Sequence, residues 1–156
     1  MSKAIRIYET GGPEVMRWEA DDPGQPKAGE ALVRHQAIGL NFIDVYHRTG
    51  IYPLPELPAV PGMEGAGIVE AVGEGVTQVA AGDRVAYAGM PPGAYAEVRR
   101  MPADRLVQLP DAISFQQGAA MILQGMTARY LLRGCYDVKA GDTILIHAAA
   151  GGVGSI

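Results

Sequence analysis

Cysteine is almost absent from this chain: Cys135 is the single example among 156 residues. One cysteine excludes an internal disulfide framework and excludes any metal site built from several thiolates. Such sparing use of cysteine fits a reducing compartment, and we expect a cytoplasmic location. No basic pair flanks Cys135 to activate its thiol, so we expect it to be structural rather than reactive.

Long apolar runs and a strong charge of one sign are also lacking. No apolar run approaches the roughly 18 residues that cross a bilayer, and the first three residues lead into no apolar signal region. The net charge of −4 argues against nucleic acid or an anionic membrane as the main partner. A hydrophobic fraction of 48% and a charged fraction of 19% are typical of a globular domain with one substantial core.

Glycine and proline, by contrast, are abundant, with 21 and 11 copies spread along the chain. This distribution is typical of many short strands joined by turns. Strands are predicted at residues 4–9, 30–40, 65–72, 83–88, 93–99 and 106–109; apolar residues alternate in the first, and the second has a mixed apolar pattern. In the fifth of these, Ala94, Ala96 and Val98 fall on one face. We expect this β-rich block to curl into a partly open barrel.

The character of the sequence changes after the last predicted strand. Ser114 is a candidate N-cap for a helix over 115–120, and a helix-forming run follows over 122–133. The apolar, β-rich run 143–147 then predicts a buried strand. A β-rich block followed by a helix and a strand predicts two domains, which we place at 1–125 and 126–156.

A glycine-rich turn follows the last predicted strand. The residues Ala149-Ala-Gly151-Gly-Val-Gly154 form the pattern A-x-G-x-x-G, with alanine in place of the first glycine of a dinucleotide-binding loop. Gly151 would let the backbone approach a diphosphate, and Gly154 would let a following helix pack closely. A glycine-rich turn after a strand is also common where no phosphate binds, simply as the end of the strand. The residue that selects NAD or NADP would lie about 20 residues further on, outside the sequence.

Polar and aromatic residues are densest just after the second predicted strand. Asn41 is a candidate N-cap for a short helix over 42–48. Helical spacing places Asn41, Asp44 and either His47 or Arg48 along one side of that helix. A purely structural interpretation also accounts for these residues: a capped helix that stops at Gly50, with His47 exposed to solvent. The residues alone leave both interpretations open.

Four motifs in one order resemble a known family. They are Asn41-Phe-Ile-Asp-Val-Tyr-His-Arg-Thr-Gly50, Pro61-Gly-Met-Glu-Gly-Ala-Gly67, Gly125-Met-Thr-Ala128 and Ala148-Ala-Ala-Gly-Gly-Val-Gly154. This series closely resembles the NADPH:quinone oxidoreductases, the zeta-crystallin-like branch of the medium-chain dehydrogenase/reductase superfamily. The resemblance covers nearly the whole chain. It implies a GroES-like β-barrel catalytic domain and the first strand of a Rossmann NADPH-binding domain whose remainder is absent, with the active site in the cleft between the domains.

The resemblance also assigns site residues. It places four residues in the catalytic cleft: Asn41, Asp44, Tyr46 and Tyr52. It assigns contacts with NADPH to Asn41, Thr127, Gly151, Gly152, Val153 and Gly154. Structural alternatives stay open, because the two tyrosines could pack the mouth of the barrel and Thr127 could cap or line its helix. The family further implies a homodimer for the full-length protein.

Zinc-dependent members of the superfamily carry Gly-His-Glu where this chain has Gly62-Met63-Glu64, and they carry an upstream cysteine ligand that is missing here. We therefore expect no zinc, and we interpret Glu64 as structural. Without a metal to acidify an alcohol, alcohol oxidation is disfavoured. Quinones and activated enones are already electrophilic, and Asn41 with Tyr46 or Tyr52 could donate hydrogen bonds to the charge that develops on them.

The resemblance therefore implies a metal-free oxidoreductase that transfers a hydride from NADPH to a quinone. One alternative is an NADPH-dependent reductase of enones or enoyl thioesters. A second is a non-catalytic domain fragment with a structural or binding role. We expect a chain that stops at Ile156 to bind NADPH weakly or not at all, and the apolar edge of 143–147 to favour association.

Overall fold

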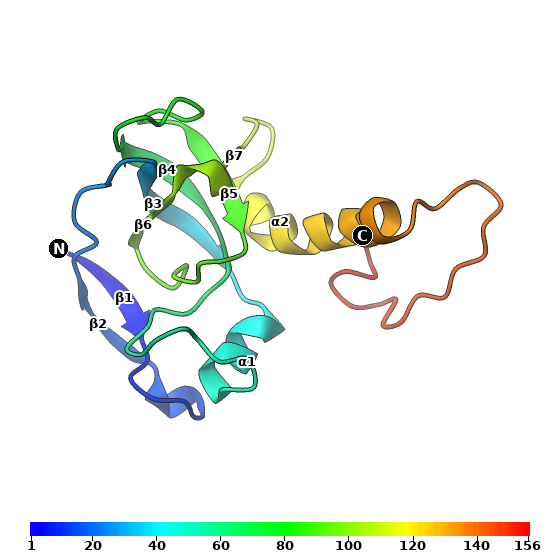
Figure 1. Ribbon diagram of the computed structural model, residues 1–156, viewed down its shortest axis with the longest axis horizontal. Coiled ribbons are helices and arrows are strands. Elements are labelled where there is room, and N and C mark those ends of the chain that lie inside the picture. The colour runs from blue at the N-terminus through cyan, green and yellow to red at the C-terminus, as the bar shows by residue number, and fades with distance from the viewer.

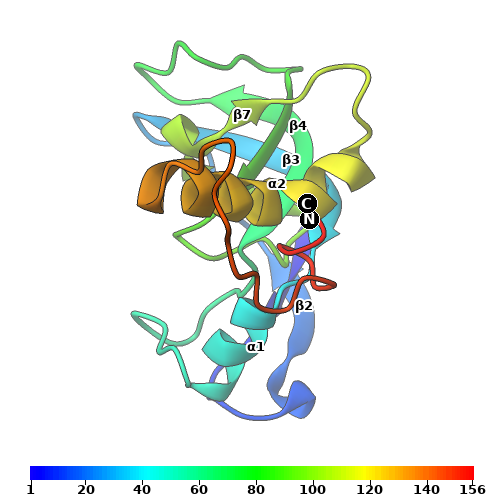
Figure 2. The ribbon, with the colours of Figure 1, turned by 90° about the vertical axis from the view of Figure 1, so that its right-hand side faces the viewer.

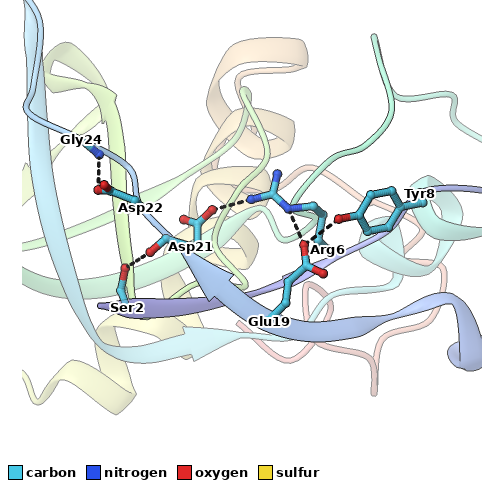
Figure 3. A network of polar contacts seen from close by, with 7 residues as sticks. All are labelled: Ser2, Arg6, Tyr8, Glu19, Asp21, Asp22 and Gly24. Carbon is cyan, nitrogen blue, oxygen red and sulfur yellow. Dashed lines mark hydrogen bonds and ion pairs between the residues drawn. The ribbon is translucent and has the colours of Figure 1, made fainter.

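The computed structural model describes residues 1–156 and is mainly β with two α-helices (Figure 1). The chain starts with an antiparallel hairpin of β1 (Ser2–Arg6) and β2 (Arg17–Asp21), and the short 3-10 helix η1 (Pro13–Val15) lies between the two strands. Partly buried and exposed polar contacts tie the hairpin together (Figure 3). Arg6 pairs with both Glu19 and Asp21, which are two residues apart and therefore share a face of β2.

A five-stranded antiparallel sheet forms the body of the fold, in the order β6-β3-β4-β5-β7. The long strand β3 (Glu30–Gly39) pairs with β4 (Glu64–Val72) on one side and β6 (Val98–Pro102) on the other. The sheet continues through β5 (Arg84–Ala88) to the short edge strand β7 (Val107–Gln108). The register of β3 against β4 shifts twice, which bends this long strand.

The segment before β6 joins the hairpin to the sheet. Ile5 donates its backbone N–H to the carbonyl of Tyr95 at 2.7 Å, and Glu97 donates to the carbonyl of Lys3 at 2.8 Å. The hairpin thus lies against one end of the curled sheet instead of standing apart from it. The predicted mainly β architecture with helices is confirmed.

The core lies inside the curl of the sheet. Ten buried residues pack together there: Ala31, Val33, Val69, Val79, Val85, Tyr87, Ala94, Met101, Ala103 and Leu106. The 3-10 turn η2 (Ala103–Arg105) contributes to this cluster. His35 lies beside it, with Nδ1 2.5 Å from the carbonyl oxygen of Ala96 and Nε2 2.6 Å from the hydroxyl of Tyr87. Burial lowers the pKa of His35 to about 4, so the ring is neutral near pH 7.

The two helices begin where their capping residues predict. Ser114 caps α2 (Phe115–Arg129) reciprocally with Gln117: the Gln117 N–H donates to Ser114 Oγ at 3.2 Å, and the Ser114 N–H donates to Gln117 Oε1 at 2.9 Å. Asn41 is the N-cap residue of α1 (Phe42–Thr49), and this helix ends at Gly50 in the left-handed conformation, as predicted.

Helix α2 packs against β3, β4 and β5, as the two views show (Figures 1 and 2). Its contact with the sheet depends on small residues: Ala119 of the helix meets Ala66 and Ala86 of the strands. Gly39, at the end of β3, allows the closest approach. A Cβ atom there would lie 2.3 Å from the carbonyl oxygen of Ala119.

Two strand predictions were wrong. Strand β2 was not predicted, because only Trp18 and Ala20 of its five residues are apolar and its pairing with β1 defines it. The strand predicted at 93–99 forms later, as β6, because residues 93–95 hydrogen-bond to the backbone of Pro61 and Gly62 rather than to a neighbouring ladder. Even so, Ala94, Ala96 and Val98 are all buried, as their alternation predicts.

The predicted strand at 143–147 does not form, and its residues are exposed. No other strand lies beside this segment, and a lone strand can satisfy neither its backbone groups nor its apolar side chains. His147, expected in a buried strand, is exposed for the same reason. Helix α2 instead runs into a π-helical stretch, η3 (Tyr130–Cys135), and Cys135 at its end is exposed rather than packed.

The boundary predicted between residues 125 and 126 falls inside α2, which crosses it without a break. The division into two domains stays a prediction. The residues after η3 run away from the sheet and then return toward α2 (Figure 1).

Candidate active site

The N-terminus of α1 meets the middle of α2 at one buried carboxylate. Glu64, the first residue of β4, is only 1% exposed. Its Oε2 accepts a hydrogen bond from Asn41 Nδ2 at 2.8 Å, and its Oε1 accepts one from the backbone N–H of Leu123 at 2.8 Å. Burial raises the pKa of Glu64, and these two donors act against that rise.

Thr127 lies one turn beyond Leu123 on α2. Its hydroxyl donates to the carbonyl of Leu123 at 2.7 Å, so the side chain is held against its own helix. This bond orients Thr127 and leaves the oxygen lone pairs for another donor. The structure therefore accommodates the helix-lining alternative for Thr127 together with a role in binding.

Asp44 is buried on the inner side of α1. Its Oδ2 accepts hydrogen bonds from the Tyr95 hydroxyl at 2.9 Å and from the Asn41 backbone N–H at 3.0 Å, while its Oδ1 has no partner. Burial raises the pKa of Asp44. Burial and the adjoining Asp44 carboxyl also raise the pKa of Tyr95.

The interpretation of His47 as a solvated helix residue was wrong. His47 is 6% exposed, because it follows Asp44 by three residues and shares the inward side of α1. Its Nδ1 atom is buried without a hydrogen-bond partner.

Tyr46 and Tyr52 lie together, at the outer end of α1 and just beyond it. Their ring centroids are 5.3 Å apart in an edge-to-face arrangement, and the Tyr52 N–H donates to the Tyr46 carbonyl at 3.1 Å. Neither hydroxyl makes a hydrogen bond within the chain, and the Tyr52 side chain is about half exposed. Both the packing role and the ligand-binding role predicted for the tyrosines fit this geometry.

The glycine-rich loop forms a tight turn. Gly151 donates its N–H to the carbonyl of Ala148 at 2.8 Å, and Ser155 donates to the carbonyl of Gly151 at 2.9 Å. Between them, the N–H groups of three consecutive residues have no partner in the chain: Gly152, Val153 and Gly154. Adjacent unpaired N–H groups in a turn are the donors that phosphate oxygens prefer.

This loop lies against α2. A Cβ atom on Gly152 would lie 2.6 Å from Oε1 of Gln124, which immediately follows Leu123. The structure therefore brings the loop, Thr127 and the Asn41–Glu64 pair to the same helix.

Two cavities flank this arrangement. A cavity of about 270 Å³ between β3 and α2 is lined by Leu40, Glu64 and Gln124, and it adjoins the residues just described. A larger cavity of about 640 Å³ lies on the other side of α1, facing the hairpin, with Trp18 and Asp44 in its wall. We place the candidate active site at the smaller cavity, because Asn41 hydrogen-bonds to Glu64 in its wall and Thr127 hydrogen-bonds to Leu123, the residue before Gln124.

Sequence reasoning missed two of the residues that build the site. Tyr95, which holds Asp44, carried no signal, because it lies 51 residues away in sequence. Glu64 stood inside a quoted motif, and its structural role is borne out by its contacts, but the pattern did not reveal that it binds Asn41. The structure contains no cluster of three or more metal-ligating side chains, and no helix with the length and apolar character to cross a membrane.

Comparison with known proteins identifies the family. Residues 27–111, more than half of the chain, match the model of the alcohol dehydrogenase GroES-like domain. The chain belongs to the GroES-like alcohol dehydrogenase family. The GroES-like fold predicted from the four motifs is thereby confirmed.

Relatives of this GroES-like chain include quinone reductases. Quinone oxidoreductase of Pseudomonas aeruginosa is 54% identical over 154 residues, which are 99% of this chain and 47% of the relative. The crystal structure of Escherichia coli quinone oxidoreductase complexed with NADPH matches with a TM-score of 0.93 and 49% identity, over 97% of this chain and 47% of that one. The predicted resemblance to quinone oxidoreductases is confirmed.

A third relative has a different reaction in its name. The 2-haloacrylate reductase of Burkholderia sp is 45% identical over 161 residues, which cover 100% of this chain and 48% of the relative. The GroES-like chain spans about half the length of the curated relatives it matches.

Proposed function

We propose that this chain provides the substrate-binding half of an NADPH-dependent quinone reductase. The observation that carries the proposal is the convergence on α2 of residues from all four motifs: Asn41 through Glu64, Thr127, and the loop at Gly152. The identity of about half of all residues with quinone oxidoreductases supports it. A division at residue 125, a homodimer and a cytoplasmic location belong to the same proposal.

The residues present fit NADPH. The unpaired N–H groups of Gly152, Val153 and Gly154 would hold the diphosphate, and Thr127 would contact the nicotinamide end. When bound, NADPH supplies the hydride for the reduction. The E. coli relative supports this choice of cofactor, because its crystal structure is a complex with NADPH.

The chain's own side chains would stabilise the charge that develops on the acceptor. Asn41 gives one of its two Nδ2 hydrogens to Glu64, and the second has no partner in the chain. This second hydrogen, with the free hydroxyls of Tyr46 and Tyr52, would donate to the quinone oxygen as it becomes negative. Asp44 would hold the N-terminus of α1 in place. The reduced quinone would take its proton from solvent, and the proposal requires no zinc.

Reduction of an activated alkene is the second candidate. The 2-haloacrylate reductase relative, 45% identical over the whole chain, favours it. Enone, enoyl-thioester and quinone reduction share hydride attack on an electron-poor system conjugated with a carbonyl. The same donors would serve each acceptor.

The test is a chimaera in which Ile156 of this chain is joined to the part of E. coli quinone oxidoreductase that the chain does not match. We expect it to oxidise NADPH with a quinone faster than with 2-chloroacrylate or an enone. The reverse order would select the second candidate. A folded chimaera that binds NADPH but reduces neither acceptor would refute the proposal.

A matched glycine variant tests the loop. A Cβ atom on Gly154 would lie 2.4 Å from the Ala148 carbonyl oxygen, so Gly154→Ala should distort the turn and weaken NADPH binding to the chimaera about tenfold or more. Gly75→Ala is the control. Gly75 lies in a distant turn, its φ is positive, and a Cβ atom there would meet nothing within 4 Å, so this change should leave NADPH binding unaltered. We expect calorimetry on the 156-residue chain alone to give weak or no binding. Micromolar binding would show that this half already completes the nucleotide site.

A further inference from the structure

One buried side chain joins the two helices of the proposed site. Asn41 stands at the start of α1 and Thr127 on α2, and the two residues do not hydrogen-bond to each other. Glu64 binds Asn41 through one carboxylate oxygen and the Leu123 N–H through the other, each at 2.8 Å. Thr127 in turn binds the carbonyl of Leu123 at 2.7 Å. Three short hydrogen bonds thus run from Asn41 to Thr127 through Glu64 and Leu123.

The attachment at Leu123 is specific. A backbone N–H inside an α-helix ordinarily serves the carbonyl four residues earlier, so few such groups donate to a side chain from another element. Here the hydrogen bond sets the position of β4 along the axis of α2. Leu123 is also the residue whose carbonyl accepts the hydrogen bond from the Thr127 hydroxyl.

We propose that Glu64 is a positioning residue of the active site, which orients the Asn41 amide and sets its place relative to Thr127. The inference rests on the proposed function, in which Asn41 and Thr127 face the acceptor and the cofactor. Glu64 itself touches neither ligand in this scheme. Its effect on the reaction passes through Asn41.

A carboxylate suits this place better than any other side chain. Both groups that face it, the Asn41 Nδ2 and the Leu123 N–H, are donors, and an ionised carboxylate is an acceptor at both of its oxygens. Room for it comes from Gly39, where a Cβ atom would lie 2.3 Å from Glu64 Oε2. With Glu64 in place, the second Nδ2 hydrogen of Asn41 is directed away from the carboxylate.

Glu64→Gln separates orientation from shape. If the introduced amide keeps its oxygen on the Leu123 N–H, its NH₂ group faces the NH₂ group of Asn41. Two donors repel, so the Asn41 amide should turn over and accept through Oδ1. The hydrogen that would serve the acceptor is then misplaced, although the volume of the side chain is unchanged.

Nuclear magnetic resonance on the full 156-residue chain tests the contact without any ligand. In Glu64→Gln, the side-chain NH₂ signals of Asn41 should move, and the Leu123 amide should exchange with solvent about tenfold faster or more. Glu9→Gln is the matched control, because Glu9 is exposed and makes no hydrogen bond in the chain, and it should change neither signal. Unmoved Asn41 signals in Glu64→Gln would overturn the inference.

Kinetics of the chimaera with a quinone test the consequence. Glu64→Gln should lower kcat about tenfold or more, with KM for the quinone changed less than about twofold. In an Asn41→Ala background the same substitution should cause no further loss, because its effect passes through Asn41. A full additional loss in that background would show that Glu64 acts independently of Asn41, and would refute the positioning role.

A swapped pair guards against a variant that fails to fold. In Asn41→Asp/Glu64→Gln the introduced amide can donate to the introduced carboxylate, so folding should recover while kcat stays low. Recovery of both folding and kcat would overturn the inference. An unsubstituted chimaera that reduces no acceptor would refute the proposed function instead, and the resonance experiment would still decide the role of Glu64.

Discussion

Gly39→Ala should destabilise the fold although its backbone is not in a left-handed conformation. The added Cβ would lie 2.3 Å from two atoms at once, the carbonyl oxygen of Ala119 and Oε2 of Glu64. The first of these is backbone, so it can retreat only if α2 moves off the sheet. Overpacking at such a contact costs about 2–3 kcal/mol of unfolding free energy. For a chain of this size that lowers Tm by roughly 4–10 °C.

Gly125→Ala, inside the helix α2 that Gly39 contacts, supplies the opposite case. A Cβ atom at Gly125 would meet nothing within 4 Å, and the residue lies inside α2. Replacing a helical glycine by alanine should therefore raise the unfolding free energy by about 0.5–1 kcal/mol. The two variants add the same methyl group, so only the surroundings distinguish them.

Urea unfolding followed by circular dichroism measures both changes, with the slope of free energy against urea checked for constancy. Because Gly39→Ala also presses on Glu64, the Asn41 side-chain signals should shift in that variant and stay in place in Gly125→Ala. Equal stabilities for the two variants would refute the packing argument. So would a destabilised Gly39→Ala chain whose Leu123 and Asn41 signals are unchanged.

Two further predictions concern buried titratable groups. Tyr95→Phe removes a donor to Asp44 and should lower the free energy of unfolding by about 1–2 kcal/mol at pH 7. The lost bond favours the ionised carboxyl, and burial already raises the pKa of Asp44, so the loss should be smaller at pH 4. A loss that grows on acidification would contradict this. The pKa of His35 is lowered from 6.5 to about 4, so its contribution to stability is complete above pH 6.5. This contribution is lost as the pH falls from 6.5 to about 4, by up to about 3 kcal/mol relative to His35→Gln. A resonance titration that gave His35 an ordinary pKa would rule out this contribution.

Much of the fold could be predicted because local rules governed it. Ser114 and Asn41 start their helices as capping residues do, and Gly50 ends α1 in the conformation that glycine favours. The sequence predicted β3, β4 and β5 to within a residue at their ends. Pairing, in contrast, decided β2 and β6, and pairing partners are not visible in a local pattern.

The segment 143–147 shows the limit of composition as a guide. Its β-branched and apolar residues have the preference of a buried strand, but preference for a pleated surface is realised only beside another strand. For the site, the motifs indicated Asn41 and Thr127 but not the carboxylate between them. That link depends on the depth at which α2 sits on the sheet, which Gly39 and Ala119 set.

The hydrogen bonds of Glu64 also have a consequence for when, during folding, the chain becomes able to bind the acceptor. They join residues 23 and 59 positions apart in sequence, and strand β3 pairs with β6, which lies near the end of the sheet-forming region. Closing such long loops costs entropy before any contact compensates for it, so we expect these bonds to form late in folding. A partly folded chain would therefore have a cap on α1 and a helix at α2, but no oriented amide between them. Recognition of the acceptor would then report the completed native state, and nothing earlier on the folding pathway.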